Sequence, residues 1–271
     1  ASNGYLYAAT HNLGPGVGTV FRTSNGGATW EQILGALNGA EGGLVLLETS
    51  DGFIYAGTGE YGEVFRTGDG GTTWESRGRF VGTMYVQSLL QASDGSLYAG
   101  TSNSGKVFRT TDGGANWTAI SPRDGLHAIY SLLEASDGYI YAGTGGQIST
   151  GVTGQIFRTN DSGANWALVA DFGGACTNVF ILLEASDGNI YAGTTYGIFK
   201  SGNGLTWEHE STGPNYEVLD FLEVNGYIYA GTGIRDGIPI GDVWSAPVCP
   251  PLPSHDAWSF VHMTDIHIGY P

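Results

Sequence analysis

The sequence predicts an all-β protein in the form of a six-bladed β-propeller, and three features of its 271 residues indicate this fold. A Tyr-Ala-Gly-Thr phrase or a close variant recurs six times, a Phe-Arg-Thr phrase follows most copies, and the tyrosines lie 38 to 50 residues apart. Repeats of roughly 40–50 residues are typical of propeller blades, which are small four-stranded sheets. No helical period of useful length accompanies them. We therefore expect six blades of four antiparallel strands, with the ring closed by terminal strands.

Each repeat is expected to contain four short strands in a fixed order. An apolar first strand, such as residues 88–90, precedes a Ser-Asp-Gly turn, which favours a hairpin because glycine accepts a positive φ. The tyrosine phrase forms the second strand, where its small Ala and Gly residues allow neighbouring sheets to approach. The Phe-Arg-Thr phrase forms the third strand. A tryptophan opens the fourth.

The two ends of the chain fit the repeat less well. The sequence enters at the second strand of the first blade, so the first strand must come from elsewhere. In the sixth blade a Pro-rich stretch precedes Trp258, which is expected to begin the fourth strand. We therefore assign residues 1–246 to the propeller. Residues 247–271 are a Pro-rich linker and a tail that closes the ring, pairs with a neighbouring molecule or begins another domain.

Composition narrows the classes of partner. The chain has 26 acidic and 10 basic residues and a net charge of −16, which argues against nucleic acid or an anionic membrane. No apolar run approaches the ~20 residues that span a bilayer. The Ala1-Ser2-Asn3 start resembles a mature chain after removal of a signal peptide, although a trimmed chain would begin the same way. We expect an extracellular or cell-surface protein. Cys176 and Cys249 are either bridged or free thiols.

A short motif separates the third and fourth strands of five repeats. Its first copy is Thr23-Ser24-Asn25-Gly26-Gly27-Ala28-Thr29-Trp30. The acidic or amide residue and the tryptophan of the five copies are Asn25 and Trp30, Asp69 and Trp74, Asp112 and Trp117, Asp161 and Trp166, and Asn203 and Trp207. This motif resembles the Asp-box, or BNR, repeat. The resemblance implies a propeller of the sialidase, sortilin and xyloglucanase kind.

We interpret these motifs as structural. An Asp or Asn side chain can accept hydrogen bonds from backbone amides a few residues onward, and the tryptophan adds apolar burial beneath the hairpin. Asparagine in two of the five copies favours this interpretation over a row of metal-binding carboxylates. Calcium binding stays open. No cofactor is expected in this chain.

The repeated arginines are also expected to be structural. Arg22, Arg66, Arg109 and Arg158 occupy one position in successive blades, so they would not converge on one ligand. Glutamates at the ends of the first strands (Glu48, Glu134 and Glu184) are the expected ion-pair partners. A sialidase-like site would need converging arginines, and its Arg-Ile-Pro segment is missing from this sequence.

Function is expected where the repeats differ, namely in the loops between second and third strands and between blades. Aromatic and arginine side chains in these loops could stack on sugars or contact a protein. The candidate ligand-face residues are Tyr61, Tyr85, Arg123, Tyr196, Tyr216 and Arg235.

The tail departs from the repeats. Residues 260–269 resemble the opening strand of calcineurin-like metallophosphoesterases, in which an apolar strand delivers an Asp-x-His pair to a two-metal centre. The resemblance implies that Asp265 and His267 are metal ligands. Two ligands cannot hold such a centre, so divalent metals would require a further domain downstream.

These observations favour a non-catalytic, extracellular propeller that binds a protein or glycan. The tail would also allow assembly into a homo-oligomer or filament. Two enzyme alternatives remain: the accessory domain of a secreted metallophosphoesterase and, less favoured, a glycoside hydrolase.

Overall fold

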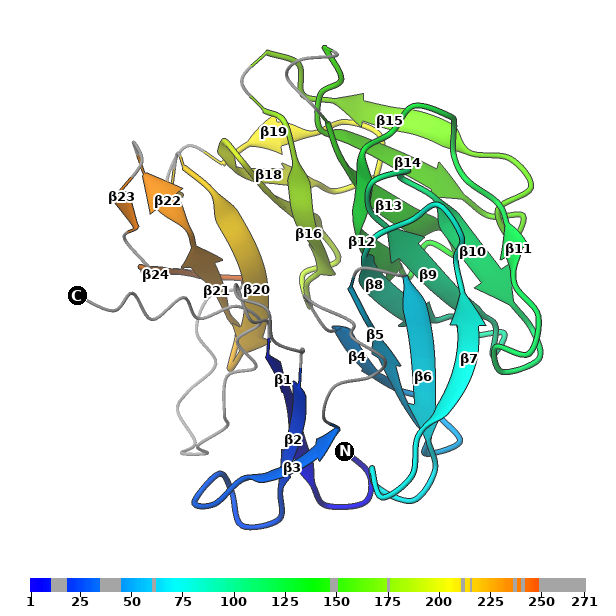
Figure 1. Ribbon diagram of the computed structural model, residues 1–271. Coiled ribbons are helices and arrows are strands. Elements are labelled where there is room, and N and C mark those ends of the chain that lie inside the picture. The colour runs from blue at the N-terminus through cyan, green and yellow to red at the C-terminus, as the bar shows by residue number, and fades with distance from the viewer. Residues whose placement is uncertain are drawn as a thin grey trace. The chain divides into compact units, whose positions relative to one another are not determined.

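The computed structural model describes residues 1–10, 19–34, 45–59, 62–146, 151–174, 176–210, 213–214, 216–235, 238–239 and 242–248. These residues form strands and turns, with no helix among them (Figure 1). Within the described ranges, therefore, no helix is long and apolar enough to cross a membrane. The expected all-β class is confirmed.

The strands form six antiparallel blades, as the repeats predict. The first three blades are β1 (Leu6–Thr10), β2 (Thr19–Thr23) and β3 (Glu31–Leu34); β4 (Val45–Glu48), β5 (Ile54–Gly57), β6 (Glu63–Thr67) and β7 (Glu75–Arg79); and β8 (Val86–Gln91), β9 (Leu97–Thr101), β10 (Val107–Thr110) and β11 (Thr118–Ala119). The last three are β12 (Ala128–Glu134), β13 (Ile140–Gly145), β14 (Gln155–Thr159) and β15 (Ala167–Asp171); β16 (Val179–Glu184), β17 (Ile190–Thr194), β18 (Gly197–Ser201) and β19 (Glu208–His209); and β20 (Val218–Val224), β21 (Tyr227–Thr232) and β24 (Val243–Pro247). A small hairpin, β22 (Ile234–Arg235) and β23 (Ile238–Pro239), lies between the last two of these strands.

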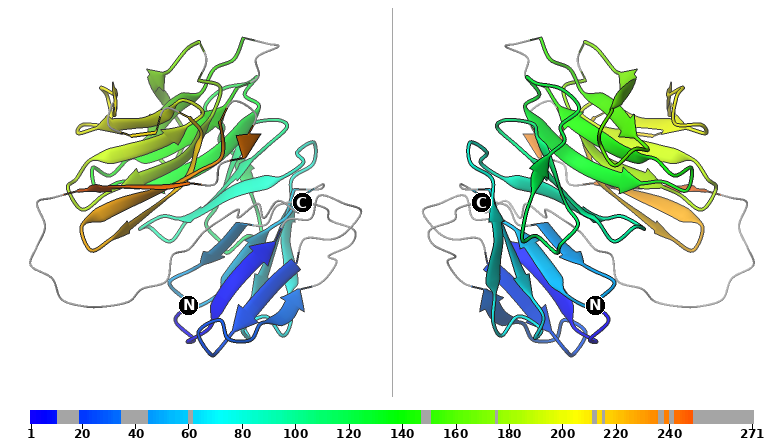
Figure 2. Two further views of the ribbon diagram at one scale, coloured as in Figure 1. Left: turned by 90° about the vertical axis from the view of Figure 1, so that its left-hand side faces the viewer. Right: turned by 90° about the vertical axis from the view of Figure 1, so that its right-hand side faces the viewer.

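Among the described residues the four middle blades have four strands each, and blades 1 and 6 have three. The segments expected to supply the first strand of blade 1 and the fourth strand of blade 6 lie outside the described residues. The strands of each blade lie side by side in two further views (Figure 2). The tail expected to close the ring lies outside the described residues, except Pro247 and Val248.

The chain divides into two compact units, Ala1–Leu132 and Leu133–Pro271, and the boundary along the sequence falls within β12. The second strands of the four middle blades are buried on both sides, rather than on one side as alternation alone suggests, whereas β1 has no fully buried residue and β21 alternates. All five residues of β9 and of β17 are buried, for example. The reason is that neighbouring blades cover both surfaces of a sheet.

Glycine makes this close contact between blades possible, as the sequence predicts. A Cβ atom at Gly57 would lie 2.6 Å from Cγ1 of Val86 in the next blade, and one at Gly193 would lie 2.8 Å from Cγ1 of Val218. Both distances are shorter than carbon atoms tolerate. The Tyr-Ala-Gly-Thr phrase is thus a consequence of blade packing.

Candidate functional site

The turns that carry the Asp-box-like motif are closed by their own side chains. In blade 3 the Thr110 hydroxyl donates to Oδ1 of Asp112 at 2.7 Å and accepts from the amide of Gly114 at 3.1 Å. The same Asp112 oxygen accepts from the backbone of Asn116 at 2.9 Å, and Oδ2 accepts from its side chain at 2.8 Å. Equivalent bonds surround Asn25, Asp69, Asp161 and Asn203. In every copy the acidic or amide side chain has partners within its turn.

These hydrogen bonds favour the charged form of the carboxyl groups. Bonds from Asn116 and Thr110 lower the pKa of Asp112 to about 2, and bonds from Asn165 and Thr159 do the same for Asp161. Bonds from Thr73 and Thr67 hold the pKa of Asp69 well below its usual range. A low pKa is expected of a carboxylate that stabilises a turn, because the hydrogen bonds it accepts favour its charged form. A general acid working near neutral pH would instead need a raised one.

Two tryptophans of these motifs, Trp117 and Trp207, pack on the blade before their own. The Trp117 indole donates to the backbone oxygen of Arg77 in β7 at 2.7 Å and meets the ring of Phe80 edge-on, with centroids 5.2 Å apart. Trp207 similarly meets Phe172, with centroids 6.3 Å apart. The expectation of burial beneath the tryptophan's own hairpin is therefore incomplete, because the indole also joins two blades.

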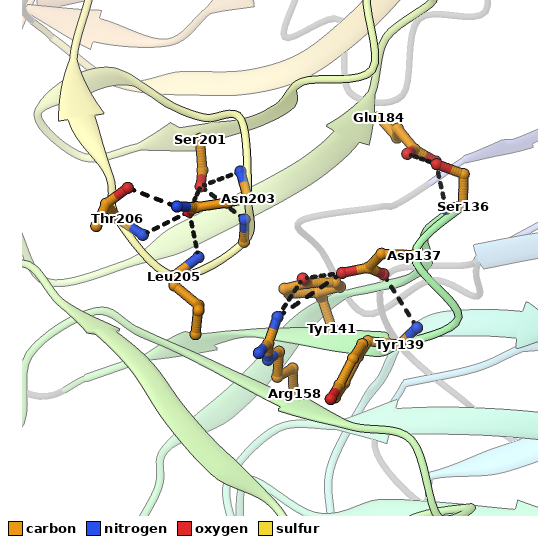
Figure 3. A network of polar contacts seen from close by, with 11 residues as sticks. Ser136, Asp137, Tyr139, Tyr141, Arg158, Glu184, Ser201, Asn203, Leu205 and Thr206 are labelled. Carbon is orange, nitrogen blue, oxygen red and sulfur yellow. Dashed lines mark hydrogen bonds and ion pairs between the residues drawn. The ribbon is translucent and has the colours of Figure 1, made fainter.

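The repeated basic residue forms a polar cluster at the Ser-Asp-Gly turn. In blade 4 the Arg158 guanidinium stacks over the Tyr139 ring at 4.0 Å and donates to the Tyr141 hydroxyl at 3.2 Å (Figure 3). The hydroxyl in turn donates to Asp137 at 2.7 Å, and Asp137 lies 3.7 Å from Arg158. Burial, together with the bond to Asp137, raises the pKa of Tyr141 to about 12. Lys200 and Asp187 repeat the arrangement in blade 5.

The ionic partners of these basic residues differ from the expected glutamates. Arg22 and Arg66 pair with Glu31 and Glu75 on the fourth strand, and Arg109 pairs with Asp94. Glu184 instead accepts hydrogen bonds from the amide and hydroxyl of Ser136 in the preceding blade (Figure 3). Glu48 accepts from the amide of Ser2 in the same way. In blades 3 and 4 the arginine pairs with the turn aspartate, and the strand-end Glu184 joins two adjacent blades instead.

The structure describes the side chains of four of the six residues predicted as a ligand face, two in each unit. In the first unit Tyr85 is half-buried and Arg123 is exposed. In the second unit Tyr196 is 51% exposed and lies against the His209 ring, at 5.9 Å between centroids, while Tyr216 is half-buried. Tyr61, Asp265, His267 and Cys249 lie outside the described residues, and so does the side chain of Arg235. Cys176 is a buried thiol.

The described ranges contain no group of three His, Cys, Asp or Glu residues that could hold a metal ion. Calcium binding and the two-metal centre of a longer chain stay predictions.

The loop that carries Tyr85 in the first unit is the candidate binding site. Residues 80–85 join blades 2 and 3, and a tight turn holds them, in which the amide and hydroxyl of Thr83 both donate to the Phe80 oxygen. Gly82 takes a φ of +84° in this turn, which glycine accepts without strain. The turn presents Val81, which is 89% exposed, beside Met84, which is 38% exposed.

Backbone hydrogen bonds anchor this loop on both flanks. The amide of Gly62 donates to the Met84 oxygen and the amide of Phe80 donates to the Gly62 oxygen, both at 2.9 Å. On the other flank Ser102 donates to the Tyr85 oxygen at 2.9 Å. The loop thus shows apolar side chains on a fixed backbone. Sequence reasoning selected Tyr85 and missed Val81; an apolar Val and Met beside a loop glycine were the available signal.

Comparison with known proteins supports the fold. No family description matches the sequence, and no curated protein matches it. Several solved structures are similar. A chain of a nidogen–laminin complex aligns with a TM-score of 0.61 and 11% identity over 84% of this chain and 86% of its own. YCF48 bound to D1 peptide aligns with a TM-score of 0.55 and 17% identity over 79% and 70%.

An enzyme of the same fold is also similar. The GH74 xyloglucanase from Xanthomonas campestris aligns with a TM-score of 0.59 and 16% identity, over 84% of this chain but only 41% of the enzyme. At sequence identities this low, structural similarity supports the fold alone. Together with the six blades, it establishes that this chain folds as a β-propeller.

Proposed function

We propose that this chain is a non-catalytic binding module that recognises a protein partner through the loop of residues 80–85. The observation that carries the proposal is the 89% exposure of Val81 on a backbone held by hydrogen bonds at both flanks. An exposed apolar side chain on an ordered loop loses little conformational entropy on binding, and this favours affinity. The setting we propose is extracellular, in keeping with the acidic composition.

Two further observations support a protein partner. One similar structure is a complex of nidogen with laminin and another is YCF48 bound to a peptide, so propellers of this kind occur in protein complexes. The net charge of −16 favours a partner whose contact surface is basic around an apolar centre, because complementary charge speeds association and selects partners. A glycan partner would instead need aromatic side chains gathered in one place. Of the described candidate tyrosines, Tyr196 is 51% exposed, while Tyr85 and Tyr216 are half-buried.

Capture experiments with three forms of the full chain test the proposal. The baits are the wild type, Val81→Glu and Leu205→Glu, applied to the secreted proteins of cells that make the chain. Leu205 is a matched control, because it is an apolar residue 52% exposed at an Asp-box-like turn. We expect a protein retained by the wild type and by Leu205→Glu but reduced about tenfold or more by Val81→Glu, since a buried charge costs at least this much affinity.

The same capture experiment can contradict the proposal. Retention of one set of proteins by all three baits would show that the loop of residues 80–85 does not bind a partner. Release of phosphate from an ester, or of reducing sugar from a polysaccharide, by the purified chain would contradict its non-catalytic character. Binding to a glycan array that Val81→Glu leaves unchanged would move the site to other loops.

A further inference from the structure

Two arginines share one carboxylate on blade 2. Arg66 of β6 and Arg77 of β7 each place Nη2 at 2.5 Å from the same atom, Oε1 of Glu75. Within the described ranges neither guanidinium pairs with a second carboxylate. This cluster of three side chains therefore has one positive charge in excess, in a chain whose net charge is −16.

The other repeated basic residues are balanced one to one. Their pairs are Arg22 with Glu31, Arg109 with Asp94, Arg158 with Asp137, and Lys200 with Asp187. Arg66 would form such a pair with Glu75 by itself. The excess charge in blade 2 is therefore contributed by Arg77.

Arg77 lies at a position that is apolar in two other blades. The register between β6 and β7 shifts by one residue at Arg77, which forms a β-bulge. The same shift falls at Ile33 in blade 1 and at Val169 in blade 4, and both of these side chains pack against apolar core clusters. Because blades form this bulge with an apolar side chain, the fold alone does not require an arginine here.

The guanidinium of Arg77 has unused donors. An arginine side chain carries five N–H donors, and the bond from Nη2 to Glu75 is the one that Arg77 makes among the described residues. Its Nε is buried and has no hydrogen-bond partner in those ranges. The side chain is still 21% exposed, beside a Glu75 side chain that is 54% exposed. A further acceptor arriving from solvent would thus be stabilised, because an unpaired charged donor is costly.

We propose that Arg77, with Arg66 beside it, binds an oxyanion next to Glu75, either a phosphate group or a carboxylate. A guanidinium binds such groups through paired N–H donors, and the ligand would supply the negative charge that the cluster lacks. This inference does not depend on the proposed function, since none of the three residues belongs to the loop of residues 80–85.

Nuclear magnetic resonance of the full chain tests the proposal. Nitrogen–proton correlation spectra contain the Nε–H signals of arginines, and loss of one signal in Arg77→Ile identifies that of Arg77. Titration of the wild type with inorganic phosphate, and separately with acetate, should shift this signal until the site is saturated. The anion that acts at the lower concentration distinguishes a phosphate ligand from a carboxylate ligand. A signal that neither anion moves would overturn the proposal.

Two substitutions should change the affinity for phosphate in opposite directions, as measured by calorimetry. Arg77→Ile should lower it at least about tenfold, because charge-assisted hydrogen bonds are lost. Glu75→Gln should raise it about two- to fivefold, because a half-exposed carboxylate no longer competes for the guanidinium groups. Weaker binding in both variants would mean that the cluster only supports the fold, contrary to the proposal.

Arg79→Ile is the matched control, because Arg79 is an exposed arginine of the same strand. It should leave the affinity for phosphate within about twofold, since exposed charges are screened by salt. An equal loss in Arg77→Ile and Arg79→Ile would show that phosphate is attracted only by the charge of the strand, and would contradict the proposal. If Arg77→Ile does not fold, Glu75→Gln and the arginine signals of the wild type still decide the outcome.

Discussion

The two ends of each blade differ in how much their connections vary from one blade to the next. At the hairpin end, the turns after the first and third strands repeat nearly the same residues, and side chains such as Asp112 and Arg158 have hydrogen-bond partners within the blade. At the loop end, the connections vary, and one of them exposes Val81 almost completely. The comparison teaches that repetition in this chain stabilises blades, whereas binding is expected from loops that depart from it.

The largest expected effect is loss of an indole between blades. Trp117→Ala should lower the free energy of unfolding by about 3 kcal/mol, near the lower end for removal of a buried aromatic residue. It removes the contact with Phe80 and the bond to Arg77. Urea unfolding measures the change. Trp30→Ala should lower the free energy of unfolding clearly less, because its indole is 45% exposed. Equal losses in the two variants would show that packing of Trp117 between blades does not stabilise the fold.

A smaller loss is expected from a buried hydroxyl of the hairpin end. Thr110 is 3% exposed and its hydroxyl bonds to Asp112 and Gly114, so Thr110→Val should cost about 1–3 kcal/mol by leaving those groups without their partner. The exposed Thr72 offers a control, and Thr72→Val should change stability by less than about 0.5 kcal/mol. Similar losses in the two variants would mean that the turn does not depend on its threonine.

The acidic turns should also make stability depend on pH. The pKa of Asp112 and of Asp161 is about 2 in the folded chain, below the usual 3.8, so their contribution is present above pH 3.8 and is lost as pH falls through about 2. Replacing both by Asn, the residue at Asn25 and Asn203, should flatten the fall in unfolding temperature between these pH values. If the unfolding temperature of the double variant falls with pH as it does in the wild type, Asp112 and Asp161 are not the cause of the fall.

The smallest effect on stability is expected at the loop end. Val81→Ser should change the free energy of unfolding by less than about 0.5 kcal/mol, because the side chain is 89% exposed. The same substitution should weaken partner binding, which a titration by calorimetry measures. A loss of stability as large as that in Thr110→Val would show that Val81 packs within the blade.

Much of the fold could be predicted from the sequence because each blade repeats the same contacts. The Tyr-Ala-Gly-Thr phrase identified all six second strands, and Gly57 shows why: an added Cβ would meet Val86. The partners of the arginines were predicted less well. Choosing between a strand-end glutamate and the turn aspartate Asp137 depends on distances that spacing along the chain does not contain.

The exposure of individual side chains in the candidate site could not be predicted from the sequence. Aromatic type and loop position suggested Tyr85, Tyr196 and Tyr216, but exposure is set by how each loop folds back on its neighbours. Val81 is exposed because Thr83 closes a turn at Gly82 and turns the side chain outward. No composition rule distinguishes such a valine from a core residue.

Footprinting of the bound partner tests the central claim most directly. Hydroxyl-radical labelling of the chain, free and in complex with a protein captured by the wild type, reports the exposure of each side chain. We predict that labelling of Val81 and Met84 falls on binding, while labelling of Leu205 and Trp30 at the hairpin end stays unchanged. Protection of Leu205 and Trp30 with Val81 and Met84 still fully labelled would contradict the division between structural turns and binding loops.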